Sequence, residues 1–287
     1  MIFCYKTDCI KVMLPHNIIY YVISKKSVIN NIFFKFYIKK YYTFNSLIFN
    51  NLPRDSILMK AVILAGGLGK RLKPLTNDRP KPMIEVLNVP IIEWQLKWFK
   101  KHNIKEIIIC VGYLKENIID YLGSGNKLGI NIGYIVEDNP LGTGGALKNT
   151  SSLLNSSTDE GFFMTNGDIL TNINPHKLCG EKISSIAVVP LRSPYGVVNI
   201  DNESNVIGFD EKPEIPDKWI NAGVYYFTNE VFEYLPDNGN IEVTALPAMA
   251  NDQKLKGMRF NDNFWRSIDS HKDIDEAAKE LQSSKLV

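Results

Sequence analysis

AVILAGGLGKRLKPLTNDRPKPM, residues 61–83, begins as an apolar run typical of a buried strand and continues into a glycine loop rich in lysine and arginine. Glycines allow backbone N–H groups to come close to an anion, and neighbouring cations balance its charge. The stretch therefore predicts a phosphate-binding loop at the end of a strand. The alternative is a basic surface turn.

Two common phosphate loops do not fit this stretch. A P-loop has the pattern G-x-x-x-x-G-K-[ST], whereas here Gly69 follows Gly66 after only Gly67 and Leu68, and Arg71 follows Lys70. A dinucleotide-binding fingerprint opens a helix, but Pro74 interrupts any helix after these glycines. The sequence thus indicates a third kind of loop.

The composition of the 287 residues is that of an ordinary soluble globular protein, with 45% hydrophobic and 22% charged residues. The net charge of +2 does not favour nucleic acid as a partner, since the cations gather in one loop. None of the four cysteines, Cys4, Cys9, Cys110 and Cys179, has the spacing of a metal site. Reduced thiols and a cytoplasmic location are predicted.

Residues 1–58 differ from the rest, since they are rich in Ile, Phe, Tyr, Lys and Asn and almost lack Gly, Ala, Asp and Glu. Their longest apolar run, residues 18–23, is too short to span a bilayer, and they lack the features of a secretory signal. They can be an over-extended start with Met59 as the true initiator, a disordered or surface-attached extension, or an added element. We predict one domain over 59–287, and membrane attachment only if residues 1–58 are part of the protein.

From residue 60 onward, strand-like and helix-like segments alternate, which predicts an α/β fold with a doubly wound, Rossmann-like sheet. The expected strands are 60–65, 106–113, 130–137 and 161–170, and the expected helices are 90–103, 115–123 and 145–154. After Pro175, strands at 183–191, 195–201, 206–213 and 221–228 follow more closely and predict an antiparallel extension that forms the second wall of a cleft. Helices are expected at 229–235, 241–251 and 271–282.

Four further motifs carry chemistry. Asp168 ends an apolar strand in TNGD, where a carboxylate facing a phosphate loop suits Mg²⁺, although it can also be a capping or turn residue. A second glycine turn, residues 137–147, offers backbone N–H groups to a flat or anionic ligand, or is a plain helix start. In FDEKP and NAGVYYF, carboxylate and amide groups suit sugar hydroxyls and a lysine suits a phosphate.

The chain resembles the sugar-1-phosphate nucleotidyltransferases, also called nucleoside-diphosphate-sugar pyrophosphorylases. The resemblance rests on five segments in order: residues 61–83, PLGTGGAL, TNGD, FDEKP and NAGVYYF. The resemblance covers residues 59 to about 278. It implies the GT-A-like fold of nucleotide-diphospho-sugar transferases, a single domain in which the antiparallel extension binds the sugar. It also implies that the phosphate of a sugar 1-phosphate attacks the α-phosphorus of a nucleoside triphosphate, with Mg²⁺ as cofactor and pyrophosphate as leaving group.

The resemblance also assigns roles to residues. Arg71, Lys81 and Asp168 are the expected catalytic residues, the two cations acting on the triphosphate and Asp168 holding the metal. The expected nucleotide-binding residues are Leu64, Ala65, Gly66, Gly67, Gly69, Glu137, Gly142 and Thr143. The expected sugar-phosphate-binding residues are Gly196, Glu211, Lys212 and Asn221.

Glu137 lies at the family position that reads the base. An ionised carboxylate only accepts hydrogen bonds, and guanine offers two neighbouring donors. Glu137 with PLGTGGAL resembles the mannose-1-phosphate guanylyltransferases, so GTP and mannose 1-phosphate are the expected substrates. Glucose 1-phosphate with CTP, UTP or dTTP remains an alternative, as does a catalytically silent regulatory subunit. A homo-oligomer is also possible.

The chain departs from the family at its second metal aspartate, which commonly stands in Trp-x-Asp-apolar-Gly. Here Ser267 occupies that position, and Asp269 follows two residues later. The resemblance to glucose-1-phosphate cytidylyltransferases at this point makes Asp269 the expected second metal ligand, and it keeps that enzyme among the alternatives.

Overall fold

The computed structural model describes residues 9–14, 18–23, 59–154, 161–180 and 183–283. The chain divides into two compact units, Met1–Ser56 and Ile57–Val287. In the first unit, β1 (Cys9–Leu14) pairs antiparallel with β2 (Ile18–Ile23), with Cys9 opposite Ile23. No helix among the described residues has both the length and the apolar character needed to cross a membrane. The predicted domain boundary at residue 58 stays a prediction.

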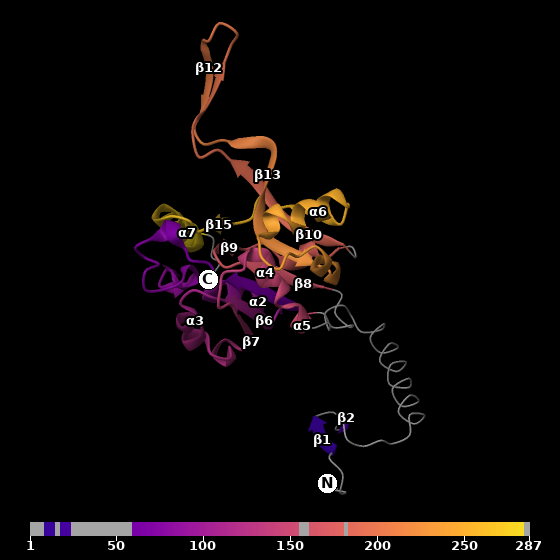
Figure 1. The fold of residues 1–287 in the computed structure, drawn as a ribbon. Coiled ribbons are helices and arrows are strands. Elements are labelled where there is room, and N and C mark those ends of the chain that lie inside the picture. The colour runs from indigo at the N-terminus through magenta and orange to yellow at the C-terminus, as the bar shows by residue number, and fades with distance from the viewer. Residues whose placement is uncertain (1–8, 15–17, 24–58, 155–160, 181–182, 284–287) are drawn as a thin grey trace. The chain divides into compact units, whose positions relative to one another are not determined.

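The second unit is built on a seven-stranded mixed sheet (Figure 1). Across the sheet lie β14 (Leu255–Arg259), β10 (Ser184–Arg192), β13 (Glu214–Phe227), β8 (Phe162–Asn166), β3 (Lys60–Ala65), β6 (Glu106–Val111) and β7 (Asn131–Val136). β8, β3, β6 and β7 run parallel, whereas β13 pairs antiparallel with both β8 and β10. The α/β class and the doubly wound mixed sheet are therefore confirmed.

Helices cover both faces of the sheet because β3 alternates its apolar side chains between them. Ala61 and Ile63 pack with the apolar residues of α2 (Ile91–Lys101) and α3 (Lys115–Leu122). Val62 packs with α4 (Gly142–Lys148), α5 (Ser151–Leu154) and α6 (Ala245–Asn251) on the other face. A third cluster joins Leu72 of the glycine loop to Ala277 and Leu281 of α7 (His271–Ser283).

Two smaller ladders position the site. β9 (Ile169–Thr171) pairs antiparallel with β15 (Trp265–Ser267), and β4 (Glu85–Val86) pairs with β5 (Val89–Pro90). β11 (Val197–Ile200) and β12 (Val206–Asp210) form a hairpin that projects from the body of the unit beyond the start of β13 (Figure 1). We call this hairpin the arm.

The structure differs from the sequence expectations in the second half. Residues 229–233 form a 3-10 turn instead of the expected helix, because Pro236 disfavours helical geometry at the preceding residue and the segment is short. β13 begins at Glu214, seven residues earlier than the expected strand. β14 and β15 were not expected. The strands after Pro175 do not form a separate wall, since β10 and β13 extend the main sheet and only the arm leaves it.

Candidate active site

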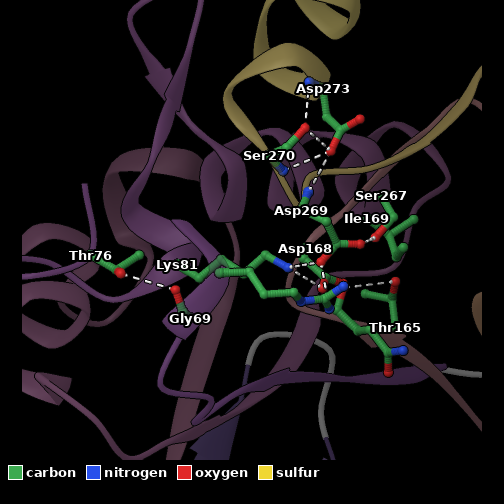
Figure 2. A network of polar contacts seen from close by, with 12 residues as sticks. Gly69, Thr76, Lys81, Thr165, Asp168, Ile169, Ser267, Asp269, Ser270 and Asp273 are labelled. Atoms are coloured by element: carbon green, nitrogen blue, oxygen red, sulfur yellow. Dashed lines mark hydrogen bonds and ion pairs between the residues drawn. The ribbon is translucent and has the colours of Figure 1, made fainter. Parts of the chain in front are cut away.

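The glycine loop after β3 folds back on itself. The Thr76 hydroxyl donates to the Gly69 carbonyl at 3.0 Å (Figure 2). Gly69 has a φ of 57°, and a Cβ there would lie 2.9 Å from the Thr76 side chain. Glycine is therefore required, because other residues rarely adopt this conformation and the space is taken. Lys81 follows this closed loop in the chain and lies beside Gly69. The Cβ of Lys81 would be 3.1 Å from a Cβ on Gly69.

Asp168 is placed by a tight turn between β8 and β9. The Gly167 N–H donates to the carbonyl of Leu64 at the end of β3, at 2.9 Å. A Cβ on Gly167 would lie 2.5 Å from the same carbonyl oxygen, so no other residue lets the two strand ends approach in this way. Asp168 consequently lies beside the glycine loop, at the carboxyl ends of parallel strands, where α/β sheets bind ligands.

Asp269 reaches the same place from the far end of the chain. The pairing of β15 with β9 sets Ser267 opposite Ile169, and the Ile268 N–H donates to the Asp168 carbonyl at 3.0 Å. The backbone N–H groups of Asp269 and Ser270 donate to the Asp273 carboxylate, at 3.0 and 2.7 Å, at the start of α7 (Figure 2). This cap fixes the turn that carries Asp269.

The two carboxylates converge on Lys81 (Figure 2). Its Nζ lies 2.6 Å from Asp168 Oδ2 and 2.8 Å from Asp269 Oδ1. Arg71 also pairs with Asp269 at 2.8 Å, and the Ser267 hydroxyl donates to its other oxygen at 2.8 Å. Burial acts to raise the pKa of Asp269, but the hydrogen bond and charge of Lys81, with Ser267 and Arg71, outweigh it and hold that pKa below its usual value.

These residues fit a magnesium ion, because two carboxylate oxygens already point at one cationic centre. No cluster of three or more His, Cys, Asp or Glu residues suited to a metal occurs in the described part of the chain. The protein would thus supply Asp168 and Asp269, and phosphate oxygens and water would complete the shell. Mg²⁺ is commonly bound in this way, through one or two carboxylates and substrate phosphates.

A cavity of about 300 Å³ lies beside this cluster, at the carboxyl ends of β3 and β8. All the predicted nucleotide-binding residues line it, together with Lys81 and Asp168. Arg71 and Asp269 are not part of the lining; Arg71 pairs with Asp269, and Asp269 contacts the lining residue Lys81. The volume lies at the lower end of the range for ligand pockets, about 300–1,000 Å³.

Glu137 forms part of the cavity wall and lies next to Gly66 of the glycine loop. Its Oε2 accepts a hydrogen bond from the Leu141 N–H at 3.3 Å, and its Oε1 lies 3.0 Å from where a Cβ of Gly66 would be. Burial raises the pKa of this carboxyl, and the Leu141 bond offsets part of that effect. A partly buried carboxylate of this kind is stabilised by ligand N–H donors.

In the second glycine turn, residues 137–147, several backbone N–H groups that the sequence suggested for ligand binding form hydrogen bonds within the protein. The N–H groups of Gly144 and Gly145 donate to the Gly239 carbonyl, and the Thr143 N–H donates to the Asn240 side chain. These groups are therefore occupied. Gly142 and Thr143 line the cavity without a free row of donors for a phosphate.

The predicted sugar-phosphate residues lie outside the lining of this cavity. Gly196 and Glu211 meet at the root of the arm, where a Cβ on Gly196 would lie 3.1 Å from Glu211 Oε2. Lys212 and Glu211 are both exposed and lie 3.5 Å apart. Asn221, on β13, donates to the Tyr225 hydroxyl at 2.7 Å. The structure thus brings Gly196, Glu211 and Lys212 together but not to the nucleotide cavity.

Sequence reasoning missed several residues of the site. Pro82, Pro140 and Asn240 line the cavity without having been expected there. Gln95, on α2, donates to the backbone on both sides of the Asp168 turn. Its signal in the sequence was a polar residue on the apolar face of an amphipathic helix; Asn240 had no such signal.

A family model described as nucleotidyl transferase matches residues 60–284. D-glycero-alpha-D-manno-heptose 1-phosphate guanylyltransferase of Campylobacter jejuni is 38% identical over 177 residues, covering 61% of this chain and 78% of that protein. Mannose-1-phosphate guanylyltransferase catalytic subunit beta of Dictyostelium discoideum is 37% identical, covering 75% of this chain and 62% of that protein. The chain thus spans less than two thirds of the mannose enzyme.

Among solved structures, HddC from Yersinia pseudotuberculosis complexed with GMP-PN resembles this chain with a TM-score of 0.60 and 28% identity. The match covers 78% of this chain and 99% of HddC.

Proposed function

Because the chain belongs to the nucleotidyl transferase family, we propose that it transfers a guanylyl group from GTP to a sugar 1-phosphate of manno configuration and releases pyrophosphate. The sequence resemblance to the sugar-1-phosphate nucleotidyltransferases is confirmed, as is the enzyme class. The base, the sugar and the metal are the proposal. Both relatives described above are named as guanylyltransferases, and both names specify a manno sugar.

The observation that carries the choice of base is Glu137 in the cavity wall. Its carboxylate is partly buried and accepts one hydrogen bond from the described residues, that of the Leu141 N–H, so it has room to accept further donors. Guanine presents two adjacent N–H donors, whereas the pyrimidines present a donor beside acceptors. A partly buried carboxylate that cannot donate would therefore favour guanine.

The chemistry needs no protein nucleophile. The sugar phosphate is already mostly dianionic near neutral pH, since its second pKa is about 6. Arg71 and Lys81 would bind the triphosphate and stabilise the charge that develops on the departing pyrophosphate. A magnesium ion held by Asp168 and Asp269 would neutralise phosphate charge. Lys212, with Glu211 and Gly196 at the root of the arm and Asn221 on β13, would bind the sugar phosphate.

The test is a matrix of GTP, CTP, UTP and dTTP against mannose 1-phosphate, manno-heptose 1-phosphate and glucose 1-phosphate, with Mg²⁺ and with EDTA, measured by pyrophosphate release. We expect GTP with a manno sugar to be turned over at least about tenfold faster than any other pair. A higher rate for glucose 1-phosphate with a pyrimidine nucleotide would contradict the proposal. Nucleotide binding without turnover of any pair would favour the regulatory-subunit alternative.

The remaining expectations stay predictions. A cytoplasmic location follows from the thiol composition and the nucleotide substrate. Self-association would be measured by sedimentation.

A further inference from the structure

A buried glutamine on α2 contacts the turn that carries Asp168. The Gln95 side chain is only 2% exposed. Its Nε2 donates to the Asn166 carbonyl at 2.7 Å and to the Ile169 carbonyl at 3.0 Å. These carbonyls stand on either side of Gly167 and Asp168, so one amide group ties both ends of the turn to the helix.

The amide of Gln95 is used as a donor only. Its Oε1 is buried and has no hydrogen-bond partner among the described residues. The opposite orientation of the amide would set Oε1 against two carbonyl oxygens, which is repulsive. The site therefore demands an –NH₂ group, and a carboxylate of the same shape could not replace it.

Packing alone does not explain a glutamine here. The rest of the buried face of α2 is largely apolar, with Ile92, Leu96 and Phe99 fully buried. A buried acceptor without a partner costs free energy that an apolar side chain of similar size avoids. What the glutamine provides in return is its pair of hydrogen bonds to the Asp168 turn.

Among the described residues, backbone hydrogen bonds also hold this turn, from the Gly167 N–H to the Leu64 carbonyl and from the Ile268 N–H to the Asp168 carbonyl, and Lys81 pairs with the Asp168 side chain. Gln95 is the side-chain contact from the helical layer. We propose that Gln95 is a positioning residue that fixes Asp168 for cation and phosphate binding. This inference rests on the proposed function. Partners that orient a metal ligand typically contribute about 10–100-fold to metal affinity or activity.

The test compares Gln95→Met, which keeps the length of the side chain but has no donor, with Trp98→Phe. Trp98 is also buried on α2 and donates to a later carbonyl of the same segment, that of Ile173, at 2.8 Å. Gln95→Met removes two hydrogen bonds between α2 and the Asp168 turn. Trp98→Phe removes one hydrogen bond between α2 and the same segment, but outside that turn.

Binding of Mn²⁺ is measured by electron paramagnetic resonance, in the presence of a GTP analogue with a methylene group between its α- and β-phosphorus atoms. We expect Gln95→Met to weaken Mn²⁺ binding about tenfold or more and to lower kcat by a similar factor, with a smaller effect on the KM for sugar 1-phosphate. Trp98→Phe should lower Tm and leave Mn²⁺ binding within about twofold of the wild type.

Unchanged Mn²⁺ affinity in Gln95→Met, equal weakening in Trp98→Phe, or a wild-type protein that binds no Mn²⁺ would each overturn the inference. If Gln95→Met does not fold, Gln95→Asn replaces it, since its amide is too short to reach both carbonyls; wild-type Mn²⁺ affinity in that variant would overturn the inference equally. Absence of guanylyl transfer by the wild type would instead count against the proposed function, because the Mn²⁺ measurement needs no turnover.

Discussion

Lys81 occupies the point at which the two aspartates converge. Its side chain is only 13% exposed, and its ammonium group contacts both carboxylates at less than 3 Å. A divalent cation bound by the same oxygens would have to displace it. Lys81 therefore keeps the two carboxylates together in the free protein, and its displacement would make the ammonium group available to the phosphates.

Lys81→Met should consequently have opposite effects on metal binding and turnover. Without the ammonium group the two carboxylates repel each other, so the nucleotide-free protein should bind Mn²⁺ roughly tenfold more tightly. Pyrophosphate release should fall by at least about a hundredfold, because a cation on the triphosphate is lost. Lys70→Met, the same change of charge in the same loop, serves as the control. Equal or weaker Mn²⁺ binding in Lys81→Met would refute this interpretation.

Asp168→Asn tests the same cluster from the carboxylate side. The amide keeps the shape of the side chain but removes the charge that Lys81 contacts and that a metal needs. We expect turnover to fall by about a hundredfold or more while Tm changes by only a few degrees. Near-normal turnover would remove Asp168 from the metal site.

Glu137 makes stability depend on pH. Its pKa is raised in the folded protein, chiefly by burial. Between the ordinary pKa and the raised one, the folded state binds more protons than the unfolded state, so stability falls as pH rises through that window. Glu137→Gln should remove the free-energy cost of ionising the Glu137 carboxyl in the folded protein and so raise Tm at pH 7. The difference in Tm between this variant and the wild type should disappear near pH 4, at the ordinary pKa. A difference in Tm that does not vary with pH would contradict the assignment.

The same substitution tests base recognition. A glutamine amide both donates and accepts, so Glu137→Gln should shift preference from GTP toward UTP, by roughly tenfold to a hundredfold in the ratio of kcat/KM. Rates with each nucleotide at a fixed sugar 1-phosphate give this ratio. If the order of preference is unchanged, Glu137 does not contact the base.

At the scale of residues, the cavity lining was predictable where chemistry and sequence spacing coincide. Lys81 and Asp168 stood in recognisable motifs, and both lie at the cavity. Asn240 was not predictable as a site residue, and the sequence marked Gln95 only as a polar residue on an apolar helix face, because each acts on a segment about 70 or more residues away. Such pairings depend on the sheet and not on neighbours in the chain.

At the scale of elements, the glycines of α4 allow the helix to lie against the loop at residues 236–240. A Cβ on Gly145 would lie 2.5 Å from the Asp237 carbonyl and 2.8 Å from the Leu141 side chain. The backbone N–H groups of Gly144 and Gly145 meet the Gly239 carbonyl through this close approach. The glycines thus serve packing between two segments of the protein that border the cavity.

Gly145→Ala should therefore destabilise the protein although alanine is the better helix former. The usual gain of about 1 kcal/mol for alanine in a helix should be replaced by a loss of about 1–3 kcal/mol from the steric conflict. Gly133→Ala, in β7, is the control, since a Cβ there meets nothing within 4 Å. Urea unfolding of both variants measures the difference. A Gly145→Ala protein as stable as the wild type would show that the loop at 236–240 adapts.

Elements were predictable where the hydrophobic period was long. β3, α2, β6, α3 and β7 all lie where strand-like apolar patterns or helical spacing indicated them. β15 is three residues long and β14 is a largely exposed edge strand, so neither has a period that can be recognised. Their formation depends on pairing with β9 and β10, which are distant in sequence.

At the scale of the whole molecule, the order of the strands could not be obtained from the sequence. β13 lies between β10 and β8 and runs antiparallel to both, although it follows them in the chain. Local patterns specify that a strand is buried but not which strand lies beside it. The apolar residues of the arm, Ile200, Val206 and Phe209, are exposed. Because the local pattern does not show which segments a strand packs against, the arm was expected to be part of a cleft wall.

A chain that begins at Met59 should fold and act as the full chain does. The second compact unit begins at Ile57, β3 begins at Lys60, and the family model matches from residue 60. We expect the same Tm within about 2 °C and the same kcat within about twofold, measured by calorimetry and pyrophosphate release. A large loss in either would show that residues 1–58 contribute to the catalytic unit.

The ion pairs around Lys81 have a consequence for how substrates would enter. Arg71, Lys81, Asp168 and Asp269 carry two positive and two negative charges, so the resting cluster is electrically balanced. Free nucleotide arriving alone would upset that balance more than a preformed complex of nucleotide and metal, because the metal neutralises part of the triphosphate charge. We therefore expect co-entry of nucleotide and cation, with an association rate that varies only weakly with ionic strength.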